Sequence, residues 1–197
     1  MLATIYNPLV WAITVGRVRS LRRATLAAAA IRPGDDVLDV GCGTGELTVA
    51  AQRATGDAAR VVAVDTSAAM LDRARRRAAR AGARVEFAQE PAERLPFPDA
   101  SFDVVTHSLL LHHLPPPTLH RAIGEARRVL RDGGRIVIVD FARSTGRASH
   151  VRAHLMLHGG FAAVAPRFGD LLSAAGFADV HPWPSPVPAL AIVRATR

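Results

Sequence analysis

The stretch VLDVGCGTGELT, residues 37–48, decides the fold that we expect for this chain. A short apolar run that carries one acid, Asp39, predicts a strand, and the alternating glycines after it predict a tight turn into a helix. Gly41, Gly43 and Gly45 have no Cβ, so the main chain there tolerates positive φ and can approach a ligand closely. The stretch therefore predicts a strand, a ligand-binding turn and a helix.

A second apolar run, VVAVD at residues 61–65, follows the glycine turn by about twenty residues and ends in Asp65. An acid at the tip of the second strand is where a nucleotide ribose would be held. The glycine spacing separates two cofactor classes. Dinucleotide sites need G-x-G-x-x-G, and counted from Gly41 the third glycine falls at Glu46. The spacing therefore disfavours a dinucleotide site.

An acid two residues before three alternating glycines resembles the S-adenosylmethionine site of class I methyltransferases. The resemblance covers roughly residues 32–141 and is closest to small bacterial quinone-biosynthesis (UbiE-like) and phospholipid methyltransferases. Four further stretches carry it: VDTSAAML (64–71), LPFPDASFD (95–103), LHHL (111–114) and DGGRIVIVD (132–140).

The alternation of strands and helices predicts a Rossmann-like, mostly parallel, doubly wound sheet with helices on both faces. The resemblance implies seven strands in the order 3-2-1-4-5-7-6, with the last strand antiparallel. We expect a single domain over residues 1–197. Its parts would be an N-terminal helical cap (1–31), a cofactor-binding core (32–141), and a substrate-side segment with closing strands (142–197).

Patterning along the chain places the remaining elements. Ser67 can cap a helix that runs to residue 81, and Gly82 can end it. Apolar spacing predicts further helices, and β-rich runs predict strands. The helices are expected at 118–131 and 168–175, and the strands at 84–88, 102–106, after the Gly133-Gly134 turn, 178–182 and 187–195.

The net charge of +8 suggests nucleic acid, but every one of the 25 basic residues is arginine. That bias, together with abundant alanine, is typical of a GC-rich bacterial genome, so we expect no nucleic-acid partner. Cys42 is the single cysteine, which excludes internal disulfides and fits a reducing, cytoplasmic setting. The apolar residues 2–15 are too few to span a bilayer and contain a proline.

The resemblance assigns cofactor roles to the predicted loops. Asp39 would support the methionine end of S-adenosylmethionine, and the glycine turn, with Cys42, would surround the methionine moiety and the ribose. Asp65 would accept hydrogen bonds from both ribose hydroxyls. Thr66 and Met70 would flank the adenine.

One position departs from the family pattern. Pro91 stands where many relatives have an aspartate that accepts from the adenine amino group. Glu90 or a backbone carbonyl is expected to substitute, and the Ala92 amide to donate to the ring. Adenine recognition is therefore expected to be retained but weaker.

Three histidines are candidate catalytic residues, because an oxygen or carbon acceptor often needs a general base before it attacks a methyl group. They are His107, which the resemblance also places beside the cofactor, His112 and His113. Packing or carbonyl-bonding histidines are the alternative. No metal site is expected, since no cysteine cluster or histidine set with a third ligand emerges.

Substrate specificity is expected to lie in two segments outside the shared core, the N-terminal helix and residues 141–167. Together they would cap an apolar pocket. The candidate substrate-binding residues are Tyr6, Trp11, His112, His154 and His158. The acceptor would be a small hydrophobic or amphiphilic molecule of the quinone, lipid or secondary-metabolite type.

Several alternatives stay open at this point. The charge is compatible with an RNA or protein methyltransferase, and Pro91 with a non-catalytic cofactor-binding module. The apolar stripe and arginines of residues 2–23 fit peripheral contact with a membrane. The sequence does not distinguish a monomer from a homodimer.

Overall fold

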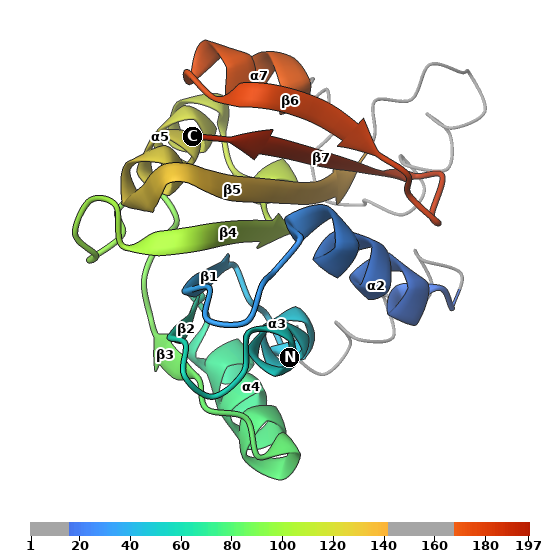
Figure 1. Ribbon diagram of the computed structural model, residues 1–197, viewed down its shortest axis with the longest axis vertical. Helices are drawn as coiled ribbons and strands as arrows, with labels where there is room; N and C mark the ends of the chain where they lie inside the picture. The colour runs from blue at the N-terminus through green and yellow to red at the C-terminus, as the bar shows by residue number, and fades with distance from the viewer. Residues whose placement is uncertain (1–15, 142–167) are drawn as a thin grey trace.

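The computed structural model describes residues 16–141 and 168–197. Their strands form one seven-stranded sheet in the order β3-β2-β1-β4-β5-β7-β6, which Figure 1 shows from edge to edge. Only β7 runs antiparallel to its neighbours β5 and β6. The predicted order and the predicted reversed strand are therefore confirmed. The strands are β1 (Val37–Val40), β2 (Val61–Val64), β3 (Glu86–Ala88), β4 (Phe102–Ser108), β5 (Leu130–Phe141), β6 (Ala178–Trp183) and β7 (Leu190–Thr196).

The two halves of the sheet, β3-β2-β1 and β4-β5-β7-β6, meet between β1 and β4. In register, Val40 of β1 lies opposite Val64 of β2 on one side and His107 of β4 on the other. The carboxyl ends of these three parallel strands thus meet at one edge, where open α/β sheets bind ligands. The glycine loop and Asp65 follow directly at that edge.

Helices cover both faces of the sheet (Figure 1). Ser67 caps α4, since its side chain accepts a hydrogen bond from the Met70 amide, and Gly82 ends α4 in the left-handed conformation. Both caps were predicted. The helices are α2 (Val18–Ala29), α3 (Glu46–Thr55), α4 (Ala68–Ala81), α5 (Pro116–Val129) and α7 (Phe168–Ala174), with a 3-10 turn, η1 (Leu111–His113), after β4.

Alternate residues of each strand point to opposite faces, so the sheet separates two apolar cores. One core joins Leu38 and Val105 to residues of α5 and α7. The other joins Val37 and Val104 to residues of α2 and α3. Asp39 and Thr106 each lie two residues after Val37 and Val104 in the same strands. They therefore point to the face of the sheet that α3 covers.

The start of β5 differs from the prediction, which placed the strand after the Gly133-Gly134 turn. Leu130 already pairs with Phe102, and the ladder then shifts and resumes at Arg135. Residues 131–134 form the irregular stretch between, with Gly133 at φ 74°. The expected glycine turn is therefore a break inside β5, because the strand begins as soon as α5 ends.

The described part of the N-terminal segment is α2, which packs on the second core through Leu21, Ala28 and Ala29. Arg135 of β5 fastens its end by donating from Nε to the Ala29 carbonyl at 3.0 Å. Within residues 16–141 and 168–197, no helix has the length and apolar character needed to cross a bilayer.

Candidate functional site

The glycine loop leaves β1 and is fastened to β2 and packed against α4. The amides of Gly41 and Cys42 both donate to the Val64 carbonyl, at 2.8 and 3.0 Å. Gly41, Gly43 and Gly45 have φ of 72°, 54° and 74°, which L side chains rarely adopt. A Cβ on Gly45 would lie 2.8 Å from the Cβ of Ala74, so glycine is what lets α4 approach the loop.

Asp39 lies under the loop and is almost fully buried. The hydroxyls of Thr48 and Thr106 donate to its two carboxylate oxygens, at 2.5 and 2.7 Å. Burial raises the pKa of Asp39 despite these two hydrogen bonds. The contacts join β1, α3 and β4 beneath the predicted methionine site, so Asp39 also has a structural role.

Asp65 lies at the end of β2 with both carboxylate oxygens engaged by main-chain amides. Gly43 of the glycine loop donates to Oδ2 at 2.8 Å, and Ser67 donates to Oδ1 at 2.9 Å. Each carboxylate oxygen can accept more than one hydrogen bond, so both keep capacity for further donors. The partly exposed carboxylate is therefore held rigidly at the switch point and remains able to bind a diol.

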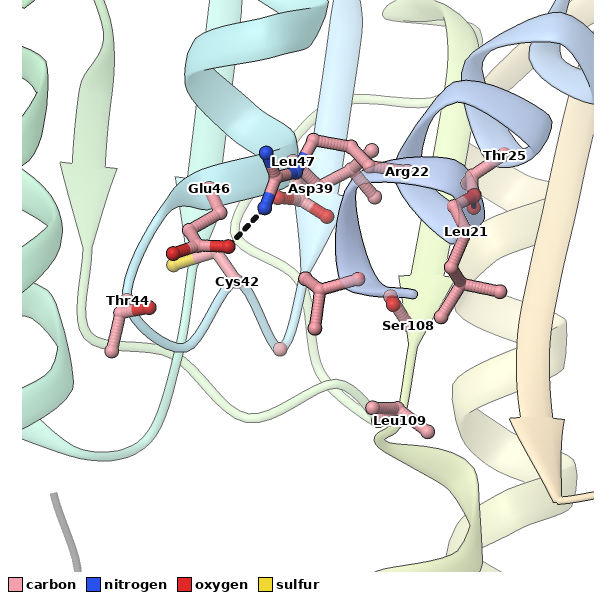
Figure 2. A pocket seen from close by; sticks show the side chains of 12 residues that line it. Leu21, Arg22, Thr25, Asp39, Cys42, Thr44, Glu46, Leu47, Ser108 and Leu109 are labelled. Carbon is pink, nitrogen blue, oxygen red and sulfur yellow. Dashed lines mark hydrogen bonds and ion pairs between the residues drawn. The ribbon is translucent and has the colours of Figure 1, made fainter. Parts of the chain in front are cut away.

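A pocket lies between the glycine loop, α2 and the end of β4 (Figure 2). Arg22 of α2 pairs with Glu46 at its wall, and Glu46 pairs also with Arg77 of α4, at 2.9 Å. The sequence analysis did not assign Arg22 or Glu46, because no local pattern shows that α2 reaches the loop. The lining consists of Val18, Leu21, Arg22, Thr25, Asp39, Gly41, Cys42, Thr44, Glu46, Leu47, Ser108 and Leu109.

Two lining residues have properties that the sequence did not reveal. Leu109 has φ 54°, a strained conformation for a leucine, and its amide donates to the Val139 carbonyl at 2.8 Å. The chain thereby turns sharply from β4 into η1 beside the loop. Burial, with Asp39 and Asp65 nearby, raises the pKa of the Cys42 thiol, so this cysteine is a neutral small side chain and not a nucleophile.

The residues predicted to surround adenine follow β2 and β3 at the same edge of the sheet. Thr66 is exposed, and its carbonyl accepts from the Gln89 side chain at 3.0 Å. Met70, Glu90 and Pro91 are half-buried, whereas Ala92 is buried. Their roles toward adenine stay predictions.

His107 is buried inside β4, which continues to Ser108 and not only to the expected Thr106. Neither ring nitrogen has a hydrogen-bond partner within the described residues. Burial lowers the pKa of His107 to about 4, so the ring is neutral at physiological pH. Because His107 is only 1% exposed, it is the least accessible of the three candidate histidines, and its predicted roles toward the cofactor and the acceptor stay predictions.

The other two candidate histidines lie side by side on η1. Their ring centroids are 3.8 Å apart. Nδ1 of His112 lies 2.7 Å from Oδ1 of Asp140, a residue at the end of β5 that the sequence analysis did not single out. Partial desolvation and the neighbouring His112 lower the pKa of His113.

The remaining candidate residues, Tyr6, Trp11, His154 and His158, lie outside the described residues. Within the described ranges, no three histidine, cysteine or carboxylate side chains converge as a metal site would require.

Comparison with known proteins adds independent information. The profile of a family described as "Methyltransferase domain" matches residues 37–134. Among curated proteins, the chain is 37% identical over 135 residues to the ubiquinone/menaquinone biosynthesis C-methyltransferase UbiE of Hahella chejuensis, covering 68% of this chain and 53% of that protein. It is 38% identical over 128 residues to UbiE of Ralstonia pickettii, covering 65% and 52%. The chain thus spans about half the length of these relatives.

Solved structures agree on the fold. YcgJ of Bacillus subtilis has a TM-score of 0.71 at 26% identity, covering 83% of this chain and 70% of that protein. A SAM-dependent methyltransferase of Aquifex aeolicus has a TM-score of 0.75 at 20% identity, covering 96% of each chain. Because the family match runs from β1 through the glycine loop, Asp65 and η1 to the start of β5, this chain belongs to the class I S-adenosylmethionine-dependent methyltransferases, with UbiE-like proteins as distant relatives.

Proposed function

We propose that this protein transfers a methyl group from S-adenosylmethionine to a small hydrophobic or amphiphilic acceptor. The observation that carries the proposal is the carboxylate of Asp65, which two main-chain amides fix at the switch point. Both of its oxygens can still accept further hydrogen bonds. The UbiE relatives are C-methyltransferases of ubiquinone and menaquinone biosynthesis, which supports a small-molecule acceptor. A cytoplasmic location and a single-domain organisation belong to the same proposal.

Asp65 would hold the ribose hydroxyls of the cofactor. The Gly43 amide comes from the glycine loop and the Ser67 amide from the start of α4, so a shift of either element would turn the carboxylate. Hydrogen bonds from hydroxyls to a carboxylate contribute about 1.5–3 kcal/mol each. Most of the affinity for the nucleoside part would therefore depend on this side chain.

Calorimetric titration with S-adenosylmethionine and S-adenosylhomocysteine tests this role. Asp65→Asn should weaken both ligands at least about tenfold, since about 1.4 kcal/mol corresponds to that factor. Asp72→Asn is the matched control, because Asp72 is exposed on α4 and pairs there with Arg75, at 3.3 Å. Equal affinities in both variants would contradict the assignment.

The methionine end is proposed to enter the pocket beside Arg22 and Glu46. The described cavity has one cation and two carboxylates, with Asp39 as the second, which fits the carboxylate and ammonium groups of a methionine moiety. Arg22 would exchange its contact with Glu46 for the ligand carboxylate. Arg77 would keep Glu46 in place, since it also donates to the Thr44 carbonyl at 2.6 Å.

A ligand that lacks the amino-acid end separates this contact from ribose binding. Arg22→Met should weaken S-adenosylhomocysteine but leave 5′-methylthioadenosine unchanged, because the latter has no carboxylate. Arg23→Met, an exposed neighbour on α2, should change neither. An equal loss for both ligands in Arg22→Met would instead mean that the pocket had rearranged.

Glu90 is proposed to recognise adenine in place of the aspartate that Pro91 replaces. Glu90→Ala removes the side-chain acceptor and should weaken adenosine-containing ligands, whereas Glu93→Ala, at a half-buried position three residues on, should not. If S-adenosylhomocysteine binds the Glu90 variant as it binds the parent protein, a backbone carbonyl makes the contact instead.

The acceptor class and membrane contact need their own assays. A competition of cell-extracted lipids and quinols against total RNA, with labelled S-adenosylmethionine, should place the label in the lipid fraction. Label in RNA or protein would favour the alternative readings. Co-sedimentation with anionic vesicles at low salt tests peripheral contact through residues 2–23, and failure to co-sediment would exclude it.

A further inference from the structure

Asp140 is a completely buried carboxylate at the carboxyl end of β5. Its Oδ2 accepts from the Leu111 and His112 amides, at 2.8 and 3.3 Å. Its Oδ1 accepts from the Phe141 amide at 2.8 Å and lies 2.7 Å from Nδ1 of His112. Asp140 therefore fixes both the backbone of η1 and the ring that η1 carries.

These contacts determine which nitrogen of His112 carries the proton. An ionised carboxylate only accepts hydrogen bonds, so the Nδ1 of a neutral ring beside Asp140 must be the protonated one. The lone pair of Nε2 is then left to accept a proton. Two neighbouring rings restrict the imidazole further. The Phe141 ring lies edge-on to it, with the ring centroids 4.8 Å apart, and the His113 ring lies beside it. The side chain of His112 is 18% exposed, unlike His107.

The turn η1, which carries this ring, follows directly on residues that line the proposed cofactor pocket. Ser108 and Leu109, which directly precede η1 in the chain, line the pocket. The Leu110 side chain lies against Gly41, where a Cβ would come within 2.9 Å of it. His112 thus follows at the same edge of the sheet as the glycine loop.

We propose that His112, positioned by Asp140, is the general base of the reaction, and that the acceptor is therefore a hydroxyl or carbon acid that must lose a proton. This rests on the proposed function. For a phenolic acceptor, the O–H proton passes to Nε2 of His112 while the oxygen bonds to the methyl carbon. The methyl–sulfur bond breaks, and its electron pair stays on sulfur as S-adenosylhomocysteine forms. The imidazolium is stabilised beside Asp140 and then releases its proton to solvent.

Other titratable groups around His112 do not take this role. His113, on the same turn, has no hydrogen-bond partner within the described residues that would fix its ring. His107, from β4, is buried, and burial lowers its pKa to about 4, which makes it a weak base. From β5, Asp140 faces the ring, and Phe141 is apolar.

The test compares two acceptors of equal shape, 4-butylphenol and 4-butylaniline. The phenol needs a base, whereas the neutral amine already has its nucleophilic lone pair. His112→Asn keeps a donor toward Asp140 but cannot accept the proton. It should lower kcat on the phenol by about 100-fold or more, and kcat on the aniline by less than about threefold. His120→Asn is the matched control, because His120 is exposed on α5 and its Nδ1 lies 2.7 Å from the Pro116 carbonyl, and it should retain kcat on both.

A pH profile separates a base from a structural residue. In the parent protein, kcat on the phenol should fall as pH decreases, because protonated His112 cannot accept a proton, and in His112→Asn this fall should disappear. Equal losses on both acceptors, or an unchanged pH profile, would overturn the proposal. So would transfer to neither probe while S-adenosylhomocysteine still binds. If the parent protein does not bind S-adenosylhomocysteine, the proposed function itself is overturned.

Discussion

Gly45→Ala tests the contact that holds the glycine loop against α4. Gly45 has φ 74° and ψ 20°, and an added Cβ would meet the Ala74 Cβ at 2.8 Å, which real side chains do not reach. A left-handed alanine costs about 1–2 kcal/mol, and forcing an extra methyl into a packed interface costs about 1–3 kcal/mol more. We therefore expect the free energy of unfolding to fall by about 2–4 kcal/mol, after the small gain from a stiffer unfolded chain.

The chain offers a matched control for the backbone part of this cost. Gly82 has nearly the same conformation, φ 63° and ψ 23°, with no atom within 4 Å of an added Cβ. Gly82→Ala should therefore cost only about 1 kcal/mol, the net of strain and unfolded-state entropy. The difference between the two variants isolates the steric cost.

Urea denaturation of a double-mutant cycle completes the measurement. In an Ala74→Gly background, which is itself destabilised, Gly45→Ala should cost at least about 1 kcal/mol less, because the opposing methyl is gone. Gly45→Ala within about 0.5 kcal/mol of Gly82→Ala would refute the reasoning. So would strictly additive costs in the cycle, since the methyl groups would then not meet.

Three further predictions concern buried ionisable side chains. His107→Leu should make the free energy of unfolding less sensitive to acid. The pKa is 6.5 unfolded and about 4 folded, so the unfolded state binds the proton first and stability falls as pH drops from about 6.5 towards 4, by about 2 kcal/mol between pH 7.5 and 5. The urea midpoint should fall less between pH 7.5 and pH 5 in the variant than in the parent protein. An equal fall in the two proteins would contradict this prediction. Asp39→Asn should raise the free energy of unfolding at pH 7, because burial penalises the ionised form of Asp39 and raises its pKa. This gain in stability over the parent protein should shrink as pH falls and Asp39 becomes protonated. A gain that grows in acid would contradict the prediction. Arg135→Gln should cost about 3–5 kcal/mol, since it leaves Asp35 without its buried partner; a thermal melt that is unchanged would contradict it.

Local patterns in the sequence were sufficient for the first two strands, the glycine loop and the caps of α4. Glycine spacing, the apolar runs at β1 and β2, and the caps Ser67 and Gly82 act within a few residues, so they can be interpreted without knowing the fold. The strand order came from the family resemblance, and the observed sheet has that order.

His107 shows where local reading was insufficient. A strand that ended at Thr106 would have put this histidine in the loop beside the cofactor. Pairing with β1 and β5 instead extends β4 to Ser108, and the alternation of the strand then turns the His107 ring toward the core. Strand length depends on the neighbouring strands, which a local pattern does not contain.

The sequence by itself determined the strand–loop–helix units, the glycine loop and the acid at the tip of β2, because each depends on the conformational preferences of neighbouring residues. Only the tertiary structure decided which side chains meet: Arg22 with Glu46, 24 positions apart, His112 with Asp140, 28 apart, and Thr106 with Asp39, 67 apart. Such pairs form where separate strands and helices end at the same edge of the sheet. Their distances follow from the packing of the whole chain, and no single segment encodes them.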